Sequence, residues 1–182
     1  MKNFVQFLTV LRLILSPLIF IIAIFLESYF LALILFLVAS ITDYFDGMLA
    51  RKYNVESIEG KILDPVADKI LIVFSLFTIT VLMEDPWIAI MASVILSREF
   101  LVSALREFWA INQAETLAVS FLAKLKTTTQ FIAISMFLIG LGLNDALTLF
   151  IASFVLFLAT LITLKTGMDY ILSYVNTNKS KQ

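Results

Sequence analysis

Four aspartates lie close together in an otherwise apolar sequence, and these residues are the best suited to chemistry. Asp43 and Asp46 fall at the end of one apolar run, and Asp64 and Asp68 fall at the start of the next. A carboxylate at membrane depth is strongly unfavourable unless it is paired, hydrated or bound to a metal. Four carboxylates at close range also repel one another unless cations neutralise them. One or two divalent metal ions would meet both conditions, and a two-metal site suits phosphoryl transfer.

The composition limits which metal and which catalytic groups are possible. The chain has 182 residues and contains neither cysteine nor histidine. The lack of histidine removes the commonest general base and nitrogen ligand, and the lack of cysteine removes thiolate sites and disulfides. Any base must therefore be a carboxylate, a lysine or a tyrosine. Any metal held by the protein must be bound through oxygen, which points to Mg²⁺, Mn²⁺ or Ca²⁺.

Six apolar runs must position these residues. The sequence is 61% hydrophobic with a mean hydropathy of +1.01, far above the roughly 45–50% apolar content of a soluble domain. Each run has the length of about 20 residues that crosses a hydrocarbon core of ~30 Å. The runs cover residues 8–26, 29–50, 62–83, 87–109, 120–143 and 146–172. The sequence therefore predicts an all-α membrane protein, a single domain of residues 1–182 folded as a bundle of six transmembrane helices.

The basic residues predict how the bundle is oriented. The three turns at residues 27–28, 84–86 and 144–145 contain no lysine or arginine. If the N-terminus is cytoplasmic, all thirteen basic residues fall in or near cytoplasmic segments, which is a strong positive-inside signal. We therefore expect a protein of the cell inner (plasma) membrane with both termini in the cytoplasm. The four aspartates would then lie near the cytoplasmic headgroup boundary, as a polar metal site at the ends of the second and third helices.

In each of these two helices the candidate site residues share one face. At ~100° per residue, one side of the second helix carries five of them: Asp43, Asp46, Gly47, Ala50 and Arg51. One side of the third helix carries three more, spaced four residues apart: Gly60, Asp64 and Asp68. The glycines allow a ligand to approach closely, and the planar guanidinium of Arg51 can hold a phosphate.

Two alternative roles for the aspartates are also compatible with the sequence. Paired aspartates on transmembrane helices also form ion-transport or proton-relay sites. An aspartate near a helix start, such as Asp64, can be only a cap. Capping does not account for Asp43 and Asp46, which lie well inside the predicted second helix.

A group of basic residues lies at the same predicted level on later helices. Arg98 is inside the fourth helix, and Arg106 follows on nearly the same side. Lys124 and Lys126 begin the fifth helix. Two arginines and two lysines beside a metal site suit a second, anionic substrate. Alternatively, each arginine pairs with the glutamate that follows it, and the lysines only reach out to the membrane surface.

The aspartate pattern resembles the signature of the CDP-alcohol phosphatidyltransferase family. That pattern is D-x-x-D-G-x-x-A-R, then eight residues, then G-x-x-x-D-x-x-x-D. The resemblance implies a six-helix membrane core with an active site open to the cytoplasmic leaflet. It also implies transfer of a phosphatidyl group from CDP-diacylglycerol, or a related CDP-linked donor, to an alcohol with release of CMP. The partners expected are these substrates, membrane lipid and a second copy of the chain in a homodimer, and not nucleic acid.

The resemblance further implies roles for single residues. The four aspartates would hold the metal, two ions of Mg²⁺ or Mn²⁺, on the diphosphate of the donor. Asp68 would also be the base that takes the proton from the attacking hydroxyl. Contacts to CDP-diacylglycerol would come from seven residues: Thr9, Asp43, Gly47, Ala50, Arg51, Ser57 and Gly60.

Other segments resemble the branch of this family whose acceptor is sn-glycerol 3-phosphate. They are LTVLRLILSP, SREFLVSALREFWA and AVSFLAKLKTTTQ. This resemblance implies that the product is phosphatidylglycerophosphate, in phospholipid biosynthesis. The phosphate of the acceptor would be bound by Arg98, Arg106 and one of Lys124 or Lys126. The alternatives are the same chemistry on inositol phosphate, serine or an amino alcohol, and, from another class, an ion or proton transporter that uses the four aspartates.

Overall fold

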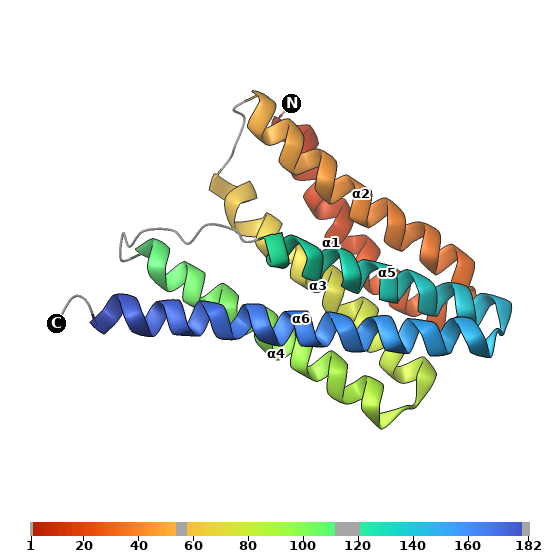
Figure 1. Ribbon diagram of the computed structural model, residues 1–182. Helices are drawn as coiled ribbons and strands as arrows, with labels where there is room; N and C mark the ends of the chain where they lie inside the picture. Colours follow the sequence, from red (N-terminus) through yellow and green to blue (C-terminus); the bar gives the residue numbers. More distant parts are fainter. Residues whose placement is uncertain (1, 54–57, 112–120, 180–182) are drawn as a thin grey trace.

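The computed structural model describes residues 2–53, 58–111 and 121–179. Within these segments it describes the side chains of residues 7–42, 66–67, 69–108, 122 and 125–173. The described backbone forms six helices and no strand (Figure 1): α1 (Lys2–Phe25), α2 (Tyr29–Tyr53), α3 (Ile58–Met83), α4 (Pro86–Ile111), α5 (Phe121–Leu143) and α6 (Ala146–Lys179). The prediction of an all-α protein is confirmed for this part of the chain.

Several helices extend beyond the apolar runs that predicted them. α1 is one helix from Lys2 onwards and contains Pro17, α2 continues to Tyr53, and α6 continues to Lys179. Hydropathy marks only the part of a helix that matches lipid, whereas the hydrogen bonds within a helix also form along polar residues. The difference lies mostly at the ends where the sequence places its charged residues.

Three tight turns connect the helices at one end of the bundle, at the positions that the sequence predicts. Each turn contains one residue in the left-handed region, with φ of 48° at Glu27, 50° at Glu84 and 51° at Asn144. After α5, the N–H of Asp145 donates to the carbonyl of Gly140 at 2.9 Å, and the N–H of Asn144 donates to that of Leu141 at 3.2 Å. This pair of bonds is a Schellman motif, which ends a helix by satisfying its last carbonyls.

An aspartate begins the next helix at two of these turns. The N–H of Trp87 donates to Oδ1 of Asp85 at 2.8 Å, and the N–H of Thr148 donates to Oδ2 of Asp145 at 3.0 Å. Such side-chain caps satisfy backbone N–H groups that have no partner inside the helix. The two caps fix where α4 and α6 start.

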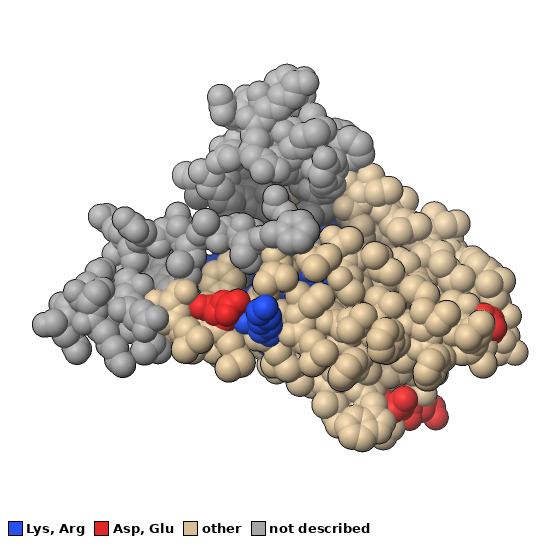
Figure 2. Space-filling model, viewed as in Figure 1, with Lys and Arg blue, Asp and Glu red and all other residues tan. Residues whose placement is uncertain are grey.

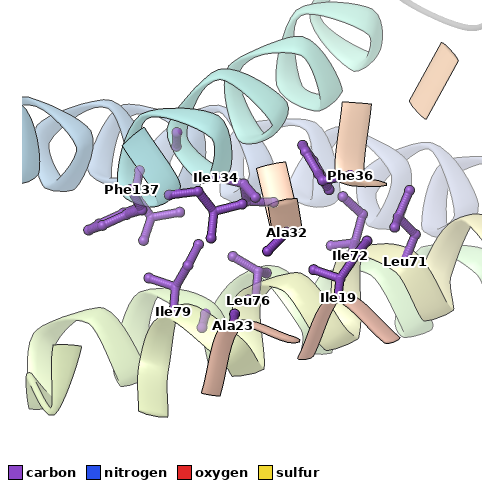
Figure 3. Packing of buried hydrophobic residues seen from close by; sticks show 14 of the residues in the cluster. Ile19, Ala23, Ala32, Phe36, Leu71, Ile72, Leu76, Ile79, Ile134 and Phe137 are labelled. Atoms are coloured by element: carbon purple, nitrogen blue, oxygen red, sulfur yellow. The ribbon is translucent and has the colours of Figure 1, made fainter. Parts of the chain in front are cut away.

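The six helices share one interior. α1 contacts α2 and α3, α6 contacts α5 and α4, and contacts of α2 with α5 and α3 with α4 join the two groups. Figure 3 shows buried side chains from several helices meeting in this core, among them Ala23, Ala32, Phe36, Ile79 and Phe137. Ala23 and Ala32 are fully buried, and such small residues let helix backbones approach closely in lipid.

Large apolar side chains cover the outside. Phe25, Trp87 and Phe150 are each more than 70% exposed, at 72%, 73% and 73%. Such a surface is expected where a protein faces hydrocarbon rather than water. Among the described residues, four segments are long and apolar enough to cross a membrane: Phe7–Phe25, Pro86–Phe108, Leu125–Leu143 and Ala146–Ser173. Shorter apolar stretches among the described residues, Tyr29–Thr42 and Lys69–Met83, run in α2 and α3 between the aspartates and the tight turns. The chain is therefore a helical membrane protein.

Candidate functional site

The predicted aspartate site lies where α2 ends and α3 begins. Asp43 and Asp46 belong to the second half of α2, and Asp64 and Asp68 belong to the first half of α3. In Figure 1 the end of α2 and the start of α3 lie on the same side of the bundle as the start of α1 and the ends of α4 and α6. The two pairs of aspartates therefore lie on the helices that the sequence assigned to them.

The side chains of this predicted site lie outside the described part of the structure. This is true of the four aspartates and of Gly47, Ala50, Arg51 and Gly60, while Ser57 lies outside the described residues altogether. Among the side chains that are described, no three acidic groups are close enough to hold a metal. The arrangement of the candidate ligands therefore stays a prediction that rests on their chemistry and on their places in α2 and α3.

α1 carries two buried polar side chains towards its start. Thr9, a predicted contact of the donor, is 1% exposed, and Arg12 is fully buried. Ser16 donates to the carbonyl of Arg12 at 2.7 Å. An arginine held inside an apolar helix is a candidate functional residue by default. Arg12 was not among the predicted site residues, although a lone arginine within the first apolar run was the signal.

The two predicted arginines of α4 meet α6. Arg98 is 8% exposed, and its Nη2 donates to Oγ1 of Thr166 at 3.0 Å. Arg106 donates to the hydroxyl of Tyr170. The Cζ atoms of Arg98 and Arg106 lie 5.7 Å and 4.9 Å from the centre of the Tyr170 ring. The prediction that both arginines share one side of their helix is confirmed.

Glu99 joins this group to α5. Nζ of Lys126 lies 2.5 Å from Oε1 of Glu99, and Nη1 of Arg98 lies 3.6 Å from the same oxygen. The alternative that Arg98 pairs with the following glutamate is therefore present in the structure. Lys126 is only 6% exposed, so the interpretation that it reaches the membrane surface is wrong. The side chain of Lys124 lies outside the described ones.

Together these residues form what we call the basic cluster, defined as Arg98, Glu99, Arg106 and Lys126. Three cations and one carboxylate give it a net charge of two positive. Nε of Arg98 is buried and has no hydrogen-bond partner among the described residues. The cluster therefore carries an excess of positive charge that a doubly negative group would neutralise. A phosphate monoester fits, since it carries a charge of about −1.5 to −2 at pH 7.

The described charges are distributed unevenly over the molecule. On the face shown in Figure 2, lysine and arginine side chains gather in the middle of the molecule, and the described charged residues at one far end are acidic. Glu27, Glu84 and Asp145 belong to the three tight turns. The three turns thus carry acidic and no basic side chains in the fold, which is the distribution on which the predicted orientation rests.

Three residues of α6 at the basic cluster were not predicted from the sequence: Thr166, Gly167 and Tyr170. A Cβ added to Gly167 would lie 2.8 Å from Cγ of Arg98, so glycine leaves room for the stem of that arginine. No local pattern indicates these residues, because the spacing within one helix does not say which other helix faces it. Tyr170 lies 64 positions from the arginine that it binds.

The chain matches the model of a known protein family over most of its length. The model of the CDP-alcohol phosphatidyltransferase family matches residues 2–165. The matched residues include both predicted pairs of aspartates and the whole basic cluster. Thr166, Gly167 and Tyr170 follow the last matched residue.

The chain is also similar to curated bacterial proteins over most of its length. It is 40% identical over 173 residues to a CDP-diacylglycerol–glycerol-3-phosphate 3-phosphatidyltransferase of Rickettsia typhi. The aligned region covers 93% of this chain and 96% of that protein. A protein with the same name from Rickettsia prowazekii is 40% identical over 172 residues, with 93% of each chain covered. The protein of that name from Escherichia coli K12 is 39% identical over 137 residues, covering 73% of this chain and 75% of that one.

Proposed function

The chain belongs to the CDP-alcohol phosphatidyltransferase family, and on that premise we propose that it transfers the phosphatidyl group of CDP-diacylglycerol to sn-glycerol 3-phosphate. The products are phosphatidylglycerophosphate and CMP, which makes the protein a transferase of phospholipid biosynthesis. The net positive charge of the basic cluster supports a phosphorylated acceptor, and the relatives named for glycerol 3-phosphate support that acceptor over inositol phosphate. Serine and amino alcohols lack a phosphate and would leave those charges without a use.

The proposed metal ligands are Asp43, Asp46, Asp64 and Asp68. This donor set fits two ions of Mg²⁺ or Mn²⁺, because it offers only hard carboxylate oxygens and comes from two helices that follow one another in the chain and touch. When bound, the ions supply electrostatic stabilisation of the diphosphate and of the leaving CMP. The lack of histidine and cysteine in the chain leaves few other ligand types.

The residues of the chain have separate tasks in the proposed reaction. The basic cluster, with Lys124, holds the phosphate of the acceptor so that the free hydroxyl of the acceptor faces Asp68. The hydroxyl oxygen forms a bond to the phosphatidyl phosphorus while the bond from that phosphorus to CMP breaks, and Asp68 takes the proton. The donor is held by Asp43 and by a further set of residues: Thr9, Gly47, Ala50, Arg51, Ser57 and Gly60.

The proposed setting is the inner membrane, with all six helices crossing it as a single domain and the site facing the cytoplasm. The three tight turns, with acidic side chains at residues 27, 84, 85 and 145 and no basic ones, support an outward position for that end. The polar halves of α2 and α3 then lie near the cytoplasmic headgroups, where a soluble phosphorylated acceptor and a lipid donor can meet. A homodimer is part of the same proposal and follows from the family alone.

The test is release of CMP by the purified protein in detergent, with CDP-diacylglycerol and Mg²⁺ or Mn²⁺. We expect CMP release to depend on glycerol 3-phosphate and on the metal. We expect the Asp68→Asn substitution to abolish it. Inositol phosphate and serine are the matched alternative acceptors.

Each contrary result has a distinct meaning. CMP release that depends on inositol phosphate or serine instead would support phosphatidyl transfer and would refute glycerol 3-phosphate as the acceptor. Ion flux through the protein in vesicles, without CMP release from any acceptor, would favour a transporter built on the same aspartates.

A further inference from the structure

We propose that Tyr170 is a positioning residue that aligns Arg98 and Arg106 for the phosphate of the acceptor. The inference rests on the proposed function and extends it to α6, which contributes no residue to the site predicted from the sequence. Tyr170 is 6% exposed, and its ring lies within 6 Å of both guanidinium carbons. Two arginines of α4 thus approach a single buried ring of α6.

The ring offsets the repulsion between two like charges. Two guanidinium groups that approach the same ring repel each other, and the negative face of an aromatic ring attracts both. The hydroxyl of Tyr170 accepts a hydrogen bond from Nη2 of Arg106, which fixes the direction in which that group points. Arg106 is otherwise exposed, and a free arginine side chain loses much rotamer entropy when it is ordered.

Arg98 is held by a second anchor on the same helix. The hydroxyl of Thr166 lies 2.9 Å from the carbonyl of Ile162 and donates back into its own helix, so its oxygen is turned to accept from Arg98. Gly167 leaves room for the arginine stem. With Nη2 bound to Thr166 and Nη1 beside Glu99, the direction of the guanidinium group is set, while most of its five N–H donors have no partner among the described residues.

This arrangement is what a preorganised anion site requires. A purely structural stack of two arginines would be expected to neutralise both, yet the single carboxylate of Glu99 is shared with Lys126. The cluster therefore stays positive while its donors are fixed in place. Fixing side chains before a ligand arrives improves affinity by removing the ordering cost from the binding step.

The test compares Tyr170→Phe, which keeps the ring, with Tyr170→Leu, which removes both ring and hydroxyl. We expect the KM for glycerol 3-phosphate to rise about threefold in the first variant and about tenfold or more in the second. The KM for CDP-diacylglycerol and kcat should change by less than about twofold, because the interaction orients only the acceptor phosphate. Phe157→Leu is the matched control, since this ring of α6 is 47% exposed on the outside, and it should leave all three constants unchanged.

Binding of glycerol 3-phosphate and of inorganic phosphate, measured by titration calorimetry in detergent, separates this inference from the proposed reaction. We expect both ligands to bind the wild type and to lose affinity in the Tyr170 variants in the same order as KM rises. The inference is overturned if the wild type binds neither ligand or if the variants bind as the wild type does. It is also overturned if the KM for CDP-diacylglycerol rises together with the KM for glycerol 3-phosphate. If Tyr170→Leu does not fold, Tyr170→Phe decides. Tyr170-dependent binding without any CMP release would refute the proposed reaction and leave the anion site standing.

Discussion

At the scale of single residues, Arg98 is the side chain on which acceptor binding depends most. Its guanidinium group is buried, bonded to Thr166 and close to Glu99, and its Nε has no partner among the described residues. The sequence could predict that Arg98 and Arg106 share one side of their helix, because eight residues make slightly more than two turns. It could not predict that Tyr170 and Thr166 lie opposite, because the facing helix is set by the packing of α4 against α6.

Replacing Arg98 by alanine should weaken binding of the acceptor and leave binding of the donor unchanged. A hydrogen bond to a charged group is worth about 1.5–3 kcal/mol, so we expect the KM for glycerol 3-phosphate to rise at least about tenfold. The KM for CDP-diacylglycerol should stay within about twofold, because the donor is assigned to residues of α1, α2 and α3. Steady-state kinetics with each substrate varied in turn measures both values. Equal rises in the two constants would contradict a role at the acceptor phosphate.

Replacing Glu99 should leave a buried cation without its partner. Lys126 and Glu99 are 8% and 20% exposed at their side chains, and breaking such a pair costs about 3 kcal/mol. Glu99→Leu should therefore lower the free energy of unfolding in mixed micelles by roughly that amount. The double variant Glu99→Leu with Lys126→Met should recover most of the loss, since it removes both charges. Losses that simply add would show that the two side chains do not stabilise one another.

At the scale of helices, the turns were the most predictable features and the helix ends were the least. Glu27, Glu84 and Asn144 adopt a positive φ within the turns that the sequence predicts. Polar residues interrupt the apolar runs there, and helix caps provide hydrogen-bond partners for the backbone groups at the helix ends. The extension of α1 to Lys2 and of α6 to Lys179 was not predictable from hydropathy, because these ends carry polar residues that are compatible with either helix or coil.

The cap on α6 should make stability depend on pH. Hydrogen bonds from the side chain and backbone of Thr148 hold the pKa of Asp145 below its ordinary value. A carboxyl group with a depressed pKa stabilises the fold above its unfolded pKa, and this contribution is lost as the pH falls through its folded pKa. Asp145→Ala should therefore melt a few degrees below the wild type at neutral pH, and the gap should close in acid.

Asp145→Asn is the matched control for that cap. Asparagine keeps an oxygen that accepts from the backbone of α6 and carries no charge. Its melting temperature should therefore lie near that of the wild type in acid and should not show the part of the pH dependence that comes from Asp145. An alanine variant that stays equally far below the wild type at every pH would contradict an electrostatic contribution from this cap.

At the scale of the whole molecule, the charge pattern and the fold agree. The described basic residues lie at a distance from the three tight turns, and the turns carry acidic side chains. The aspartates and the basic cluster belong to different helices that only the fold brings together in one bundle. The sequence could predict both groups from unusual charge in apolar runs, but not their mutual distance, which depends on how six helices pack.

The absence of cysteine allows a direct test of the orientation. Single cysteines placed at Glu84 and at Lys179 would mark the two ends of the bundle, on an otherwise cysteine-free chain. We expect a membrane-impermeant thiol reagent to label Glu84→Cys in intact cells and to label Lys179→Cys only after lysis. The reverse pattern would invert the bundle, and labelling of both in intact cells would put the number of crossings in question.

The proposed reaction is tested most directly by the identity of its lipid product. Purified protein would be incubated with CDP-diacylglycerol, divalent metal and sn-glycerol 3-phosphate labelled with ¹³C, and the lipids analysed by mass spectrometry. We predict a labelled phospholipid that carries two phosphates, formed in step with CMP and absent with Asp68→Asn. A labelled lipid formed only from another acceptor, or no labelled lipid from any, would contradict the proposed reaction.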